Sequence, residues 1–157
     1  MPIVYVETSA LIKKYIQEVG SDVIGELFEH QSTIGLFSIS VLATLELKSA
    51  LARLQRGGRI TDPDRNDLLA EFWSDSTLLS IALSGGNLLL DEAGEFLDKS
   101  ALRTLDAMHF ASAMRLKSLA ERTDETLVMV TSDLELVSAW EAEGFVTINP
   151  EHDQALE

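Results

Sequence analysis

Residues 1–18 read MPIVYVETSALIKKYIQE, and this stretch decides the fold class. Its short apolar run, Ile3–Val6, predicts a strand that is buried on both faces. The run stops at an acid, Glu7, and either Thr8 or Ser9 is expected to cap a helix that continues to about Ile16. A buried strand that passes directly into a helix is typical of an α/β protein.

The same alternation of short apolar strands and helices continues along the chain. Further strands are expected at 33–38, 78–83, 127–131 and 145–148, and helices at 22–29, 41–55, 61–74, 87–98, 103–120 and 134–143. This order predicts an α/β fold with a mostly parallel central sheet covered by helices on both faces. Because no repeat or linker interrupts it, we expect a single domain over residues 1–150 and a frayed tail at 151–157.

Composition places limits on the kind of protein. A chain of 157 residues is long enough for one domain with a substantial core. It has no cysteine, which excludes disulfides, thiolate metal sites and cysteine nucleophiles. There is no apolar stretch of membrane-spanning length and no signal-peptide pattern, so we expect a cytoplasmic protein without a membrane partner.

The charge of the chain is strongly acidic. Twelve basic and 26 acidic residues give a net charge of −14, which by itself argues against nucleic-acid binding. The bases are unevenly placed, however, since five of them lie between Lys48 and Arg65. An anionic partner can therefore still meet a local basic stretch.

Two acids follow strands of the predicted sheet. Glu7 comes directly after the first strand, and Asp133 follows the strand LVMVT. Ligands of open α/β sheets bind outside the carboxyl ends of the strands, where these two acids would share an edge. The alternative is that each acid only caps the helix that follows it.

Two more acids interrupt predicted helices. Glu46 lies in SVLATLELKSAL among small and apolar neighbours, and Asp106 lies in LRTLDAMHFASAM. Either acid alone is most simply explained as solvated. If all four acids converge, their repulsion favours a bound cation, and an all-oxygen ligand set suits Mg²⁺ or Mn²⁺. The chemistry expected of such a site is metal-assisted phosphoryl transfer.

These stretches together resemble the motifs of PIN domains, in particular the VapC-like toxins of toxin–antitoxin pairs. VYVETSALIKKY is similar to the opening motif, TLELKSAL to the second, LRTLDAMHFASAM to the third and VTSDLEL to the fourth, and FVTINP resembles the closing strand. The order and spacing span nearly the whole chain. The resemblance implies a three-layer α/β/α fold with a central parallel sheet of about five strands.

The resemblance also implies a function and its residues. It implies a Mg²⁺- or Mn²⁺-dependent endoribonuclease, a homodimer and a small antitoxin that masks the site. Carried over by motif, the catalytic and metal-binding acids are Glu7, Glu46, Asp106 and Asp133. Ser9 and Thr131 match the hydroxyl positions that support the site or contact the phosphate of the RNA substrate.

One position departs from the family. Glu7 stands where PIN domains usually have Asp, and its longer stem can displace an ion by about an ångström, which can cost about a hundredfold in rate. The alternative function is therefore a weakened module that binds RNA or antitoxin without efficient cleavage. A phosphatase or receiver domain is a more distant alternative, because no lysine follows LVMVT as those proteins require.

Two residues near the third motif have open roles. His109, one turn after Asp106, is interpreted as a structural histidine, with donation to a carboxylate or contact with substrate as the alternatives. Arg103 is interpreted as a structural or antitoxin-contact residue, with pairing to Asp106, contact with RNA or a plain surface position as the alternatives.

Overall fold

The computed structural model describes residues 1–76, 80–82 and 86–153, with side chains from 1–76 and 89–153. Five parallel strands form one sheet in the order β3-β2-β1-β4-β5. The strands are β1 Ile3–Val6, β2 Leu36–Ser40, β3 Ser80–Ala82, β4 Leu127–Val130 and β5 Val146–Ile148. The α helices are α1 Thr8–Leu11, α2 Ser21–Glu29, α3 Val41–Arg56, α4 Asp62–Ser76, α5 Gly86–Lys99, α6 Thr104–Thr123 and α7 Leu134–Ala142, with 3₁₀ turns at Ile12–Lys14 and Gln31–Thr33.

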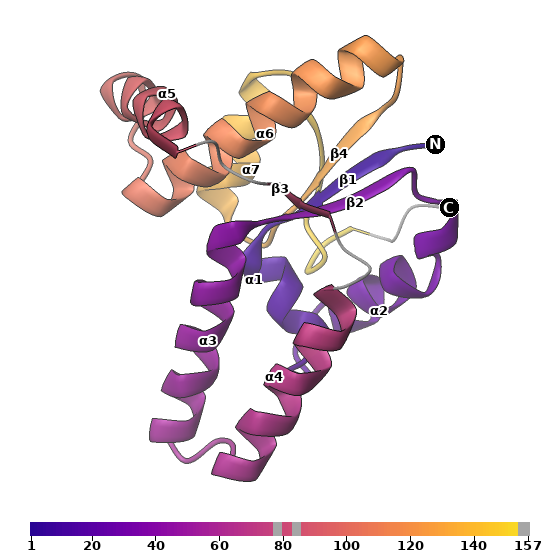
Figure 1. The fold of residues 1–157 in the computed structure, drawn as a ribbon, viewed down its shortest axis with the longest axis vertical. Coiled ribbons are helices and arrows are strands. Elements are labelled where there is room, and N and C mark those ends of the chain that lie inside the picture. The colour runs from indigo at the N-terminus through magenta and orange to yellow at the C-terminus, as the bar shows by residue number, and fades with distance from the viewer. Residues whose placement is uncertain (77–79, 83–85, 154–157) are drawn as a thin grey trace.

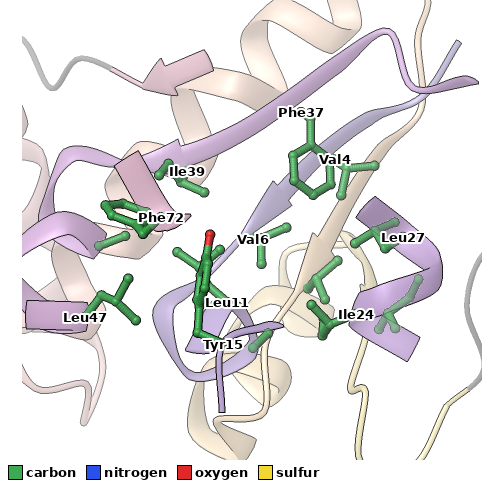
Figure 2. Close-up of a cluster of buried hydrophobic side chains, with 14 of the residues drawn as sticks. Val4, Val6, Leu11, Tyr15, Ile24, Leu27, Phe37, Ile39, Leu47 and Phe72 are labelled. Atoms are coloured by element: carbon green, nitrogen blue, oxygen red, sulfur yellow. The ribbon is translucent and has the colours of Figure 1, made fainter. Parts of the chain in front are cut away.

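Alternation along β1 separates two cores. Val4 and Val6 pack on one face with side chains of α2, α3 and α4, as Figure 2 shows. Ile3 and Tyr5 pack on the other face with side chains of α6 and α7. The predicted three-layer α/β/α class with a central parallel sheet is therefore confirmed.

The strand order determines where a site can form. The chain moves from β1 toward β2 and β3 on one side and places β4 and β5 on the other side, so β1 and β4 flank the point where the strand order reverses. Val6 pairs with Val130 in this register, and both strands end there. Glu7 and Thr131, the next residues, therefore meet at the edge where α/β sheets bind ligands.

The long helices α3 and α4 form an antiparallel pair that extends away from the carboxyl edge of the sheet (Figure 1). Ser40 ends β2 and caps α3, accepting a hydrogen bond from the backbone N–H of Leu42 at 3.1 Å. One side of α3 buries Ala43, Leu47 and Leu51 against the core. Glu46 is thereby held beside the sheet edge on a rigid element.

Several predicted boundaries differ from the structure. The second strand was expected at 33–38 but is Leu36–Ser40, because Gln31–Thr33 continues the helical direction of α2 as a 3₁₀ turn. The first helix was expected to reach Ile16, but regular α structure ends at Leu11 and a 3₁₀ turn follows. The third strand was expected at 78–83, where only Ser80–Ala82 lies within the described residues.

The C-terminal end of the described chain is fastened to the first motif. The buried ammonium of Lys13, 4% exposed, lies 2.8 Å from a carboxylate oxygen of Glu151 and 3.0 Å from one of Glu18. These carboxylates hold the pKa of Lys13 above its usual value, although burial alone would lower it. The predicted frayed tail lies partly outside the described residues, at 154–157.

Replacement of Lys13 by methionine is expected to lower the free energy of unfolding by about 1–2 kcal/mol. The loss is limited because Glu18 and Glu151 are 41% and 38% exposed and can be hydrated when the ammonium is removed. Urea denaturation measures the change. Lys99→Met is the matched control, because the side chain of Lys99 is exposed, and it should change stability by no more than about 0.5 kcal/mol. Equal effects of the two variants would contradict the fastening role.

Among the described residues, no helix is both long enough and apolar enough to cross a bilayer.

Candidate active site

Glu7 is both the end of a strand and the cap of a helix. Its carboxylate oxygen Oε2 accepts hydrogen bonds from the backbone N–H of Ser9 at 2.9 Å, from the Ser9 hydroxyl at 2.5 Å and from the Thr131 hydroxyl at 2.9 Å. The prediction that Thr8 or Ser9 caps this helix was wrong, since Glu7 is the N-cap residue. Glu7 therefore does cap this helix, as one of the two interpretations of this acid requires.

Ser9 and Thr131 join the first and fourth motifs around Glu7. Their hydroxyl oxygens lie 3.2 Å apart, and Ser9 Oγ also accepts a hydrogen bond from the backbone N–H of Ser132 at 2.9 Å. Thr131 Oγ1 accepts another from the backbone N–H of Asp133 at 3.1 Å. Both hydroxyls therefore orient a carboxylate and a loop.

Asp133 caps α7 in the same manner. Its Oδ1 accepts hydrogen bonds from the backbone N–H groups of Glu135 at 2.9 Å and Leu136 at 3.2 Å. The other oxygen, Oδ2, lies 3.4 Å from a guanidinium nitrogen of Arg103. Asp133 therefore does cap a helix, but the cap uses only one of its two carboxylate oxygens.

Glu46 projects from α3 toward the same edge and is held by two donors. Its Oε2 accepts hydrogen bonds from the Thr8 hydroxyl at 2.6 Å and from the Nε2 atom of His109 at 2.8 Å. Burial alone would raise the pKa of Glu46, but the hydrogen bond from His109, the imidazole charge and the bond from Thr8 together lower it. Glu46 is therefore ionised at neutral pH despite being mostly buried.

His109 and Tyr5 form a buried pair behind Glu46. The Nδ1 atom of His109 lies 2.6 Å from the Tyr5 hydroxyl, and neither side chain is accessible to solvent. Burial works against charge on the imidazole, but the bond to Glu46 and the nearby charge of Glu7 raise the pKa of His109 overall. Burial, and then the charge of Glu7, raise the pKa of Tyr5 well above its ordinary value, so its hydroxyl stays protonated.

Asp106 lies at the beginning of α6 with an arginine beside it. Arg103, the N-cap residue of α6, places Nε 3.1 Å from Oδ2 of Asp106 while its Nη2 atom faces Asp133. Hydrogen bonding to Asp106, followed by the charges of Asp106 and Asp133, raises the pKa of Arg103. The pairing of Arg103 with Asp106, one of the alternatives drawn from the sequence, is thus observed, and it extends to Asp133.

All four predicted acids line one cavity of about 860 Å³. The lining includes Arg53 from α3 and Arg103, which are outnumbered by the carboxylates, and apolar side chains of α3 and α6. Ser9 and Thr8 also reach this cavity. The arrangement is an acidic cleft between the sheet edge, α3 and the beginning of α6.

In both glutamates of this cleft, the hydrogen bonds that hold the side chain use only one of the two carboxylate oxygens. Within the described part of the chain, the hydrogen bonds to Glu7 and Glu46 all fall on Oε2. Suitable ligand atoms of Glu7, Glu46 and His109 lie within 4.8 Å of one another. Fixed carboxylates with a second oxygen to offer fit a hard divalent cation. The residues present thus fit the predicted kind of metal, while Asp106 and Asp133 do not belong to this closely spaced group and are paired with Arg103.

Sequence reasoning missed two residues of this site. Thr8, interpreted as a helix cap, instead donates to Glu46 from α1. Tyr5 had no assigned role, although a phenol in an otherwise aliphatic buried strand signals a hydroxyl that needs a buried partner.

Comparison with known proteins identifies relatives along most of the chain. No family model matches. Ribonuclease VapC35 of Mycobacterium tuberculosis is 30% identical over 147 residues, which covers 94% of this chain and 96% of that protein. Ribonuclease VapC45 of the same species is 29% identical over 117 residues, covering 73% of this chain and 76% of the relative.

Solved structures support the same fold. FitAcB from Neisseria gonorrhoeae aligns with a TM-score of 0.63 at 12% identity, covering 96% of this chain and 100% of that one. PAE2754 from Pyrobaculum aerophilum aligns with a TM-score of 0.57 at 22% identity, covering 93% and 89%. The resemblance drawn from the sequence motifs is confirmed, and the match favours it over a phosphatase or receiver domain. The chain belongs to the family of VapC ribonucleases.

Proposed function

We propose that this protein is a Mg²⁺- or Mn²⁺-dependent endoribonuclease and the toxin of a toxin–antitoxin pair. The observation that carries the proposal is the convergence of Glu7, Glu46, Asp106 and Asp133 on one cleft at the switch point of the sheet. Four carboxylates, which follow β1, lie on α3 and α6 and cap α7, repel one another, and Arg103 and His109 offset that repulsion only in part, so a bound cation would stabilise the group. The names of the relatives supply the substrate class, RNA.

The proposed mechanism assigns each residue a part. The four acids would hold the metal, which when bound supplies an activated water and neutralises phosphate charge. Ser9 and Thr131 keep Glu7 in one orientation, and Thr8 and His109 do the same for Glu46. Arg53 and Arg103 are the bases of the cleft lining and would attract the RNA backbone to an otherwise acidic surface.

We also propose an antitoxin, a homodimer and a cytoplasmic location. Several apolar side chains lie exposed at or near the cleft, including Leu45 at 67%, Leu105 at 46% and Leu134 at 63%. Exposed apolar groups beside a functional cleft are typical of a surface that a protein partner covers. The net charge of −14 favours a basic segment in that partner.

Glu7→Asp distinguishes the nuclease from the weakened module. With Glu7 anchored by three hydrogen bonds, we expect the unaltered protein to cleave RNA and Glu7→Asp to change the rate by less than about tenfold. Cleavage of a fluorescent RNA library in Mn²⁺ measures both rates. A silent protein that gains about a hundredfold with Glu7→Asp would instead establish the weakened module. Glu7→Gln, which keeps the size of the side chain and removes its charge, is the matched control and should be inactive.

A further inference from the structure

Both ring nitrogens of His109 are engaged. Nδ1 lies 2.6 Å from the hydroxyl of Tyr5, and Nε2 lies 2.8 Å from Oε2 of Glu46. The nearest other acid is Glu7, whose Oε1 is 3.9 Å from Nε2. The ring is fully buried and its side chain is absent from the lining of the cleft. Although His109 belongs to the group with metal-ligand spacing, it sits behind the carboxylates rather than beside them.

The partners of His109 determine where its proton lies. An ionised carboxylate only accepts hydrogen bonds, so the short contact between Nε2 and Glu46 requires a proton on Nε2. If Tyr5 donates to Nδ1, the ring is neutral with its proton on Nε2; if Tyr5 accepts, the ring carries both protons. The hydrogen bond of Nε2 is therefore directed at Glu46 and not at the cleft, whose lining does not include His109.

We propose that His109 is a positioning residue and not a metal ligand: Tyr5 and His109 form a buried chain that directs Oε2 of Glu46 away from the cleft and presents Oε1 to the cation. This inference rests on the proposed metal-dependent function. Outer partners of this kind typically contribute 10–100-fold to metal affinity, because they orient the ligand and keep it charged.

The packing around Tyr5 makes the chain rigid. Its ring meets His109 edge-on at a centroid distance of 6.1 Å and Trp140 of α7 at 6.1 Å with an interplanar angle of 90°. Because Tyr5 lies on central strand β1 and its ring is buried against α6 and α7, its hydroxyl has a fixed position. The side chains of Tyr5 and His109 thus connect Glu46 on α3 to strand β1 and fix its position.

The protonation state is tested first in the metal-free protein. Long-range ¹H–¹⁵N NMR correlations distinguish the two neutral tautomers of His109 from the doubly protonated ring. A proton on Nε2, with or without one on Nδ1, is expected. A neutral ring protonated only at Nδ1 would overturn the inference, whatever the protein does with metal or RNA.

Metal affinity is tested next by calorimetric titration with Mn²⁺ and no RNA. His109→Leu should weaken Mn²⁺ binding by about 10–100-fold, and His109→Gln, whose amide can donate from a similar position, should restore it to within about fivefold. Tyr5→Phe should weaken binding by a few-fold. Tyr15→Phe is its matched control, since that hydroxyl donates to Asp75 outside the cleft, and should leave affinity unchanged. Circular dichroism in EDTA checks that each variant is folded.

Pulsed electron paramagnetic resonance of bound Mn²⁺ shows directly whether His109 coordinates the metal. A directly coordinated imidazole produces a strong ¹⁴N coupling, which we expect to be absent. Its presence, or unchanged affinity in a folded His109→Leu variant, would refute the positioning role. If the unaltered protein binds no Mn²⁺, the metal-dependent function fails, and the tautomer measurement still decides the role of His109.

Discussion

Replacing Asp106 by asparagine is expected to lower the rate of RNA cleavage by at least about a hundredfold while the fold stays intact. Asp106 is mostly buried at the start of α6 and its carboxylate faces the cleft shared with three other acids. Asparagine has nearly the same shape, so what is lost is the negative charge that would hold the cation.

The stability of this variant should be nearly unchanged. The ion pair with Arg103, whose side chain is 74% exposed, is screened by solvent and contributes little to stability, and its loss is offset by weaker repulsion among the remaining acids. We expect a melting temperature in EDTA within about 3 °C of the unaltered protein.

Asp67→Asn is the matched control, because Asp67 is an exposed residue of α4 and does not belong to the lining of the cleft. It should cleave RNA normally. Normal cleavage by Asp106→Asn, or its unfolding, would show that the acid has been assigned to the wrong role.

The second prediction with a large expected effect is the loss of RNA cleavage when divalent metal is removed. EDTA should abolish cleavage, and Mn²⁺ or Mg²⁺ should restore it. Metal at a hundred times its dissociation constant stabilises a folded site by about 2.7 kcal/mol, which for a domain of this size corresponds to a rise in melting temperature of about 5–10 °C.

The same melting experiment contains its own control. Asp106→Asn and Glu46→Gln should lose most of the metal-dependent rise, whereas Asp67→Asn should keep it. Cleavage that persists in excess EDTA would exclude the proposed mechanism. So would a melting temperature of the unaltered protein that does not change in millimolar metal.

The sequence predicted the site best where backbone geometry alone decides position. Glu7 and Asp133 were expected at one edge because parallel neighbours end together, and the pairing of Val6 with Val130 produces that edge. Glu46 and Asp106 were expected to join them by their motifs, and both line the same cleft.

Features that depend on single side chains were less predictable. The preference of Glu7 for the cap over Thr8 or Ser9 follows from a hydrogen bond to Thr131, which is distant in the sequence. The hydrogen-bonded series of Tyr5, His109 and Glu46 joins β1, α6 and α3, so no local sequence pattern predicts it. The start of β2 was missed because the 3₁₀ turn at Gln31–Thr33 has no strong sequence signal.

The bonds between the first and fourth motifs have a consequence for synthesis on the ribosome. Ser9 and Thr131 are separated by 122 positions, and Glu7 and Thr131 by 124, yet the two hydroxyls contact each other and both donate to the carboxylate of Glu7. A nascent chain that has not yet released β4 lacks these partners, even when its N-terminal half has already collapsed. The carboxylate of Glu7 therefore reaches its full set of hydrogen-bond partners only after β4 has been made, so the N-terminal half of the chain cannot complete this arrangement alone.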